Sequence, residues 1–174
     1  MYKLPGEHHL EQNILLTSLP TLGKQWRLTF DLLPSEYISK GWANCLHLLG
    51  KGQNAGERGL LLSFKGEGIF VRTAHSTGRL PSHHLPIIDQ WTTIVIDQVQ
   101  KDGKHLFSVS IGDKEVFNAE TAKPEKLVDV KVFASDPKFL AQPGSIRNLV
   151  IEMGGEFSKI FFILSPFARG PLKN

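Results

Sequence analysis

Side chains suited to carbohydrate recognition lie at several points of this sequence where loops are predicted. A glycan site offers an aromatic face to a sugar ring, together with a few planar amides and charged groups for its polar substituents. Tyr37, Trp42 and Phe139 fall in predicted loops or at loop edges, where a core has less need of an aromatic residue. For Trp42 the alternative is packing at the rim of the fold. The candidate ligand-binding residues are Tyr37, Trp42, Asn44, Arg72, His83, Asp136 and Phe139.

Calcium is the metal that the sequence most readily suggests. Ca²⁺ needs several oxygen ligands, and Asp136 lies in a predicted loop that could meet Asn44 or Asn54 of the other rim loops. The alternative is that Asp136, which precedes a proline, holds its own backbone in a turn. The adjacent pairs His8–His9 and His83–His84 favour solvated histidines, because neighbours on a strand point to opposite faces. We expect no cofactor, with Ca²⁺ at Asp136 as the alternative.

Catalytic patterns are weak in this chain. A glycosidase needs two carboxylates about 5–9.5 Å apart, and no segment shows the alternating acids that would place two on one strand face. Cys45, the single cysteine, is expected to be a buried apolar residue; the alternative is a catalytic thiol with His47 as its base. Because no phosphate-binding loop or Gly-x-Ser-x-Gly motif is present either, we expect a protein without enzymatic activity.

The last twenty residues carry an unusual density of large apolar side chains. One interpretation is an extra strand that docks on the chain's own fold. The other is a segment that packs on a second chain and forms an oligomer or filament, because an exposed apolar strand tends to associate. The candidate oligomerisation residues are Phe157, Ile160, Phe161, Phe162, Ile163 and Leu164.

The composition limits which folds can carry these residues. The 174 residues contain 16 glycines and 10 prolines, and these punctuate the chain too often for a bundle of long helices. The formal net charge of +3 is too small to indicate a nucleic-acid partner. No apolar stretch reaches the length of a membrane span, and the N-terminus lacks the apolar core of a signal peptide.

Hydrophobic residues alternate with polar ones along most of the chain, which is typical of half-buried strands. In Trp26–Leu32 the even-numbered positions are apolar and share one face. Lys65–Gly68 predicts a hairpin turn, and Asp102–Gly103 predicts another within a three-stranded meander. Trp26 and Trp91 begin strands and are expected in the core. The predicted strands are 25–32, 43–49, 60–64, 69–73, 84–88, 91–100, 106–111, 115–118, 128–134, 146–153 and 159–164, with 84–88 at an edge because it contains a proline.

Three segments together resemble the laminin-G-like, or concanavalin-A-like, jelly roll of animal extracellular proteins. They are the Trp-led strand at 22–34, the Trp-led strand, turn and following strands at 90–116, and the closing strand with its preceding loop at 132–151. The resemblance implies an all-β sandwich of two antiparallel sheets with a concave side and rim loops. It also implies a secreted recognition module.

These inferences combine into one expected organisation. Residues 1–13 form an N-terminal arm, 14–153 the sandwich of about eleven to twelve strands, and 154–174 a C-terminal tail. The expected function is binding of a glycan or an extracellular protein through the rim loops and the concave face. The alternatives are a structural matrix protein that assembles through its tail and, less favoured, a carbohydrate-active enzyme.

Overall fold

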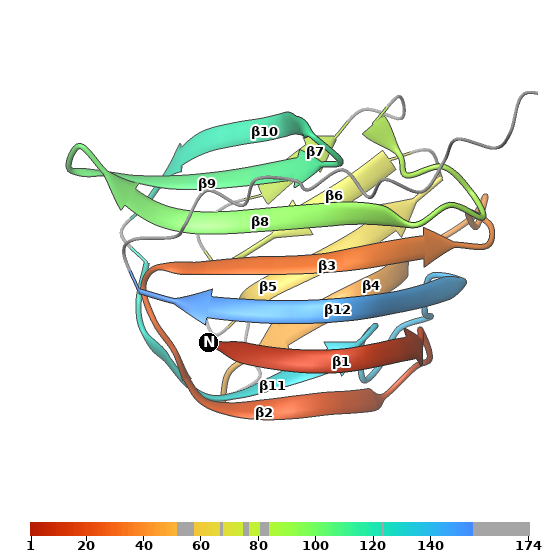
Figure 1. Cartoon of the computed structure of the whole chain (residues 1–174), viewed down its shortest axis with the longest axis horizontal. Coiled ribbons are helices and arrows are strands. Elements are labelled where there is room, and N and C mark those ends of the chain that lie inside the picture. The colour runs from red at the N-terminus through yellow and green to blue at the C-terminus, as the bar shows by residue number, and fades with distance from the viewer. Residues whose placement is uncertain (52–57, 67, 75–76, 81–83, 123, 155–174) are drawn as a thin grey trace, which may run out of the picture.

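Two antiparallel sheets of six strands each make up the described part of the protein. The structure is a computed structural model, and it describes residues 1–51, 58–66, 68–74, 77–80, 84–122 and 124–154. Figure 1 shows the two sheets as layers, with the strands of the rear layer running at an angle to those in front. The all-β jelly-roll sandwich that the sequence predicted is confirmed, and the described residues contain no α-helix.

The front layer, sheet A, has the strand order β1-β12-β3-β8-β9-β10. Burial alternates along all nine residues of β3, so one face of that strand points into the core. The predicted meander is formed by β8, β9 and β10, and the first of its turns has Asp102 and Gly103 at φ 50° and 76°, the left-handed pair of a tight hairpin. The strands are β1 (Tyr2–His9), β3 (Trp26–Pro34), β8 (Thr92–Lys101), β9 (Lys104–Ile111), β10 (Lys114–Thr121) and β12 (Gly144–Met153).

The rear layer, sheet B, has the strand order β2-β11-β4-β5-β6-β7. Its strands are β2 (Ile14–Leu22), β4 (Ala43–Leu49), β5 (Arg58–Lys65), β6 (Gly68–Arg72), β7 (Thr77–Leu80) and β11 (Leu127–Ala134). The predicted hairpin at residues 65–68 joins β5 to β6. All seven residues of the inner strand β4 are buried, so its outward-facing side is covered as well as its core-facing side.

The core lies between the two layers. Trp26, Phe30, Phe64 and Phe107 are among its largest fully buried side chains, and the rings of Trp26 and Phe107 meet edge to face with centroids 6.4 Å apart. The expected burial of Trp26 is confirmed. The same expectation for Trp91 is wrong, because this residue precedes β8 and is only half-buried at the surface.

Among the described residues, three strands appear where the sequence predicted none, and one predicted strand is absent; the predicted strand 159–164 lies outside the described residues. Residues 1–13, expected as an arm, contain β1, which pairs with β12 at the edge of sheet A. β2 and the four-residue β7 are also edge strands. Residues 84–88 form no strand. Instead Tyr37 donates a hydrogen bond from its hydroxyl to the Pro86 carbonyl at 2.6 Å, which ties that loop to the sandwich.

Candidate functional site

The outer face of sheet B gathers aromatic and cationic side chains at the β5–β6–β7 end. The strand register places Ser63, Phe70 and Arg79 in one row across the three strands. Their neighbours Phe64, Ile69 and Leu80 are buried in the core, so these three side chains project to the opposite, outer side. Ser63 is small and lies between Asn44 and Phe70 in the register.

Trp42 is the centre of this cluster, which we call the Trp42 patch: Trp42, Lys65, Phe70, Arg72 and Arg79. The rings of Trp42 and Phe70 pack edge to face with centroids 4.6 Å apart. The Arg72 guanidinium lies 4.5 Å from the Trp42 ring centroid, and the Lys65 ammonium lies 5.1 Å from it. Arg79 lies 5.6 Å from the Phe70 ring. These cation–π contacts hold the positive groups beside two half-buried rings.

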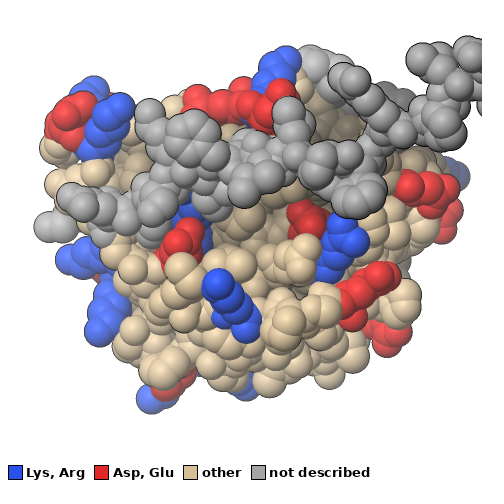
Figure 2. Space-filling model, viewed as in Figure 1, with Lys and Arg blue, Asp and Glu red and all other residues tan. Residues whose placement is uncertain are grey.

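The cations of the Trp42 patch have no acidic partner in the described part of the chain. Sheet A differs: Arg27 makes a bidentate pair with Asp97 at 2.7 and 2.9 Å, and Lys104 contacts Glu120 at 2.8 Å. Figure 2 shows this front face, where basic and acidic side chains lie next to one another. Positive charge that no described carboxylate offsets attracts an anionic ligand.

The remaining predicted ligand residues do not belong to the Trp42 patch. Tyr37 stacks on Phe64 with centroids 5.5 Å apart, and burial raises the pKa of its hydroxyl. Asn44 is buried in β4 and its backbone pairs with the loop at Leu140 and Gln142. Phe139 is 59% exposed on that loop. His83 lies outside the described residues. The structure thus brings Trp42 and Arg72 together. It places Asn44, Asp136 and Phe139 around the loop that follows β11, where the Phe139 amide donates to the Asp136 carboxylate.

Lys65, Phe70 and Arg79 are members of the patch that were absent from the predicted set. Phe70 alternates with core residues, so the sequence pattern alone marks it as an outward-facing position of a strand. One signal would have identified Phe70. It is a large aromatic residue at an outward position, with Arg72 on the same strand and Arg79 on the next.

Asp136 forms a buried pair with His47. Its Oδ2 lies 2.7 Å from His47 Nδ1, and its Oδ1 accepts hydrogen bonds from the backbone amides of Lys138 and Phe139 at 2.7 and 3.1 Å. Burial by itself raises the pKa of Asp136, but the hydrogen bonds from His47, Lys138 and Phe139 outweigh it and hold that pKa below its ordinary value. The carboxylate thus organises the loop that follows β11.

Calcium binding at Asp136 stays a prediction. Both carboxylate oxygens face hydrogen-bond donors, which matches the alternative of a turn residue. Among the residues described, no three His, Cys, Asp or Glu side chains cluster as metal ligands would. Asn54 lies outside the described residues.

Replacing Asp136 by asparagine should lower the free energy of unfolding by about 1 kcal/mol at neutral pH, because the amide loses the charge-assisted bond to His47. A carboxyl with a lowered folded pKa stabilises the fold above its unfolded pKa, and that contribution is lost as pH falls through the folded value. Urea unfolding at a series of pH values from 5 downward should therefore show the gap between wild type and Asp136→Asn closing. Asp113→Asn, at an exposed turn, is the control; a gap that stays constant would contradict the assignment.

Cys45 and His47 do not form a catalytic pair. A β-bulge between Asn44 and Leu46 disrupts the simple alternation of β4. As a result Cys45 sits in the core, where burial raises the pKa of its thiol. His47 is engaged by Asp136 instead. The expectation of a buried apolar cysteine is confirmed.

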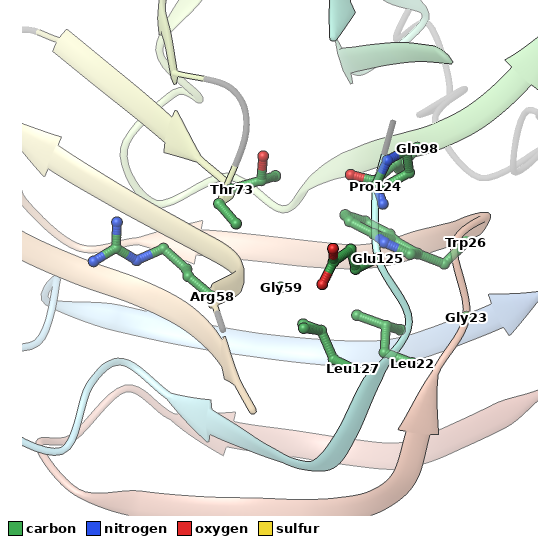
Figure 3. Close-up of a pocket in the computed structure, with 11 residues that line it drawn as sticks. Leu22, Gly23, Trp26, Arg58, Gly59, Thr73, Gln98, Pro124, Glu125 and Leu127 are labelled. Carbon is green, nitrogen blue, oxygen red and sulfur yellow. The ribbon is translucent and has the colours of Figure 1, made fainter. Parts of the chain in front are cut away.

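A small hollow opens where β2 ends and β3 and β5 begin, and Figure 3 shows Trp26, Arg58, Glu125 and Leu127 among the residues around it. Its volume is about 20 Å³. A single water molecule needs a comparable space of about 10–15 Å³, so this hollow is too small for a sugar ring. It is not a ligand site.

The predicted oligomerisation residues, from Phe157 to Leu164, lie outside the described residues, so self-association stays a prediction. In the described part of the chain, no helix is long and apolar enough to cross a membrane.

Comparison with known proteins identifies the fold. No model of a known sequence family matches the chain, and no curated protein matches it in sequence. A heptameric pentraxin from Limulus polyphemus aligns with a TM-score of 0.55 at 12% identity, over 79% of this chain and 67% of that one. Laminin α1 domains LG4-5 from mouse align with a TM-score of 0.55 at 12% identity, over 86% of this chain and 42% of that one.

A third solved structure is the CBM40 domain of a Ruminococcus gnavus IT-sialidase bound to α2,3 sialyllactose. It aligns with a TM-score of 0.54 at 12% identity, over 75% of this chain and 76% of that one. At these identities the likeness concerns the fold alone. The chain therefore has the laminin-G-like, or concanavalin-A-like, jelly-roll fold, and its function must be argued from its own residues.

Proposed function

We propose that this protein is a non-catalytic binding module that recognises an acidic glycan through the Trp42 patch. The observation that carries the proposal is the group of three cations held beside two half-buried aromatic rings, with no carboxylate partner among the described residues. A structural surface cluster normally mixes the two signs of charge, as sheet A does. The patch offers charge for a ligand to neutralise.

The chemistry of the patch suits a sugar that bears carboxylate or sulfate. The apolar face of a pyranose ring can pack on the half-buried Trp42 indole, as sugars do on aromatic residues. Arg72 is held by two rings, at 4.5 Å from Trp42 and 5.8 Å from Phe70. Its planar guanidinium offers paired N–H groups that match a carboxylate or sulfate in bidentate geometry. Because the cation is already positioned, less side-chain entropy is lost when the ligand binds.

The fold comparison lends further support. Solved domains with this fold include one bound to a sialylated sugar, so the sandwich is compatible with glycan binding. We also propose that the protein acts outside the cell, where acidic glycans are displayed; the resemblance to extracellular modules supports this. An extracellular protein with an acidic surface is the alternative ligand, since the same cations would attract it.

Binding of the full chain to immobilised ligands tests the proposal. The probes are a heparin oligosaccharide, 3′-sialyllactose and, as the uncharged comparison, lactose. We expect binding to the two acidic probes that weakens as NaCl is raised, because exposed charges are screened. The variant Arg72→Gln/Arg79→Gln should lower the affinity for heparin oligosaccharide roughly tenfold, about 1.4 kcal/mol.

A matched variant removes the same charge from the other sheet. Lys101→Gln/Lys104→Gln lies in the β8–β9 hairpin and changes the net charge equally. It should leave the affinity within about twofold of wild type, a change of roughly 0.4 kcal/mol. Equal loss in both variants would mean that net charge, and not the Trp42 patch, controls binding. Absence of binding to both acidic probes would refute the proposal.

A further inference from the structure

We infer that a second ligand site, on sheet A, takes a neutral saccharide against Trp91. The site is a cavity of about 640 Å³, within the range of roughly 300–1,000 Å³ found for small-ligand pockets. It lies at the end of sheet A where β8 begins and β9 turns into β10, and the loop after residue 84 forms its other wall. This inference does not depend on the Trp42 patch, which lies on the other sheet.

The walls of the cavity combine apolar and polar groups in the manner of a sugar site. Trp91 and Ile111 supply apolar surface, whereas Gln90, Thr93 and Asp113 supply hydrogen-bonding groups. Trp91 is half-buried, although the sequence predicted it in the core. A tryptophan left partly open to a cavity is an aromatic platform on which a sugar ring can pack.

Asp31 is the hub of a polar cluster beside this platform. Its Oδ1 accepts a hydrogen bond from the Thr93 hydroxyl at 2.7 Å. Its Oδ2 accepts one from Arg147 Nε at 3.2 Å and one from Asn148 Nδ2 at 2.9 Å. The Arg147 guanidinium lies 4.1 Å from the Trp91 ring centroid. Four side chains from β3, β8 and β12 and the loop residue Trp91 are therefore fixed as one unit.

A β-bulge makes this cluster possible. The register of β12 against β3 shifts between Arg147 and Val150, and Asn148 has φ 54°, a left-handed conformation that asparagine adopts more readily than most residues. The extra residue lets Arg147 and Asn148, which would normally point to opposite faces, both reach Asp31. Bulges of this kind often re-aim side chains next to functional sites.

The polar and charged groups that line the cavity define the class of ligand. Gln90 and Thr93 offer an amide and a hydroxyl, which suit the hydroxyl groups of a sugar. Arg147 lies beside the cavity, where its guanidinium holds the Trp91 ring in place. Asp113 and Lys114 line the cavity with charges of opposite sign, so its described lining has no excess charge and fits a neutral saccharide better than an acidic one.

Ligand-detected NMR on the full chain tests the inference, with galactose, N-acetylglucosamine and lactose as separate probes. We expect saturation transfer from the protein to at least one of them. Titration of the tryptophan fluorescence with that sugar gives its affinity. Trp91→Ala should raise the dissociation constant for that sugar at least tenfold. Thr93→Val, which removes one hydroxyl at nearly constant shape, should raise it about threefold.

Thermal unfolding shows whether each variant is folded, so that a loss of binding can be told from a loss of structure. Thr93→Val preserves the shape of a residue in β8, so it should fold even if Trp91→Ala does not. Lys104→Gln, on the opposite end of β9, is the control and should bind like wild type. If none of the three sugars shows saturation transfer, the inference is wrong. It is also wrong if folded Trp91→Ala and Thr93→Val both bind the sugar with wild-type affinity.

Discussion

Replacing Phe30 by alanine is expected to lower the free energy of unfolding by about 3–5 kcal/mol, the usual cost of truncating a buried phenylalanine. Phe30 is fully buried at the centre of β3. β3 lies between β12 and β8, so the side chain contacts the middle of the sandwich and not its margin. Loss of the ring would remove packing for core residues of both layers and leave a cavity that the rigid sheets cannot close.

Urea denaturation of Phe30→Ala and wild type measures this effect. Phe139→Ala is the matched control, because it makes the same chemical change at a side chain that is 59% exposed. It should alter the free energy of unfolding by no more than about 0.5 kcal/mol, as surface substitutions generally do. A similar loss in the two variants would contradict the placement of β3 at the centre of the core.

Replacing Trp42 by alanine is expected to reduce the affinity for a heparin oligosaccharide by roughly 30-fold, about 2 kcal/mol, the size of a binding hot spot. This prediction depends on the proposed function. The substitution removes the platform for the sugar ring. It also frees Arg72 and Lys65, whose positive groups lie 4.5 and 5.1 Å from the Trp42 ring. Both effects weaken binding, because the freed cations must be ordered again by the ligand.

Trp42→Phe separates the two effects. Phenylalanine keeps an aromatic face but has a smaller ring and a weaker cation–π attraction, so the loss in affinity should be intermediate. Isothermal titration calorimetry on wild type and both variants measures the three affinities, and circular dichroism confirms that each retains its sheets. Wild-type affinity in Trp42→Ala would exclude this residue from the site.

The core-forming strands could be predicted from the sequence because burial on one face imposes a period of two. Trp26, Phe30 and the neighbouring apolar positions alternate with polar ones, and this pattern is sufficient to place them inside. The Asp102–Gly103 turn was equally clear, since few residues tolerate positive φ at both positions.

The edge strands could not be predicted in the same way. β1 contains Pro5 and Gly6, with a register shift between Leu4 and Glu7, and β2 contains Pro20. An edge strand tolerates such residues because one side of it needs no ladder hydrogen bonds. The sequence pattern therefore favoured a loop or arm, whereas pairing with β12 and β11 makes each segment a strand.

In the candidate site, the sequence likewise indicated the residue types, and the strand pairing decided which of them meet. Trp42 and Arg72 were recognisable as ligand-binding residue types, but they are thirty positions apart in the sequence. Only the register of β4, β5 and β6 places the Arg72 guanidinium 4.5 Å from the centroid of the Trp42 ring. Asp136 was recognisable as a turn residue or metal ligand. Its contact with His47 depends on the pairing of β11 with β4, which brings the loop after β11 against that strand.

The sequence by itself determined the class of fold, the buried positions of central strands such as β3 and the hairpin turns, because each of these depends on local periodicity and on backbone preferences. Only the tertiary structure decided which polar and aromatic residues meet. Contacts such as Arg72 with Trp42, or Arg147 with Trp91 and Asp31, depend on strand order and on the bulge in β12. Strand order and bulges are set by packing across the whole sandwich, so they leave no local pattern in the chain.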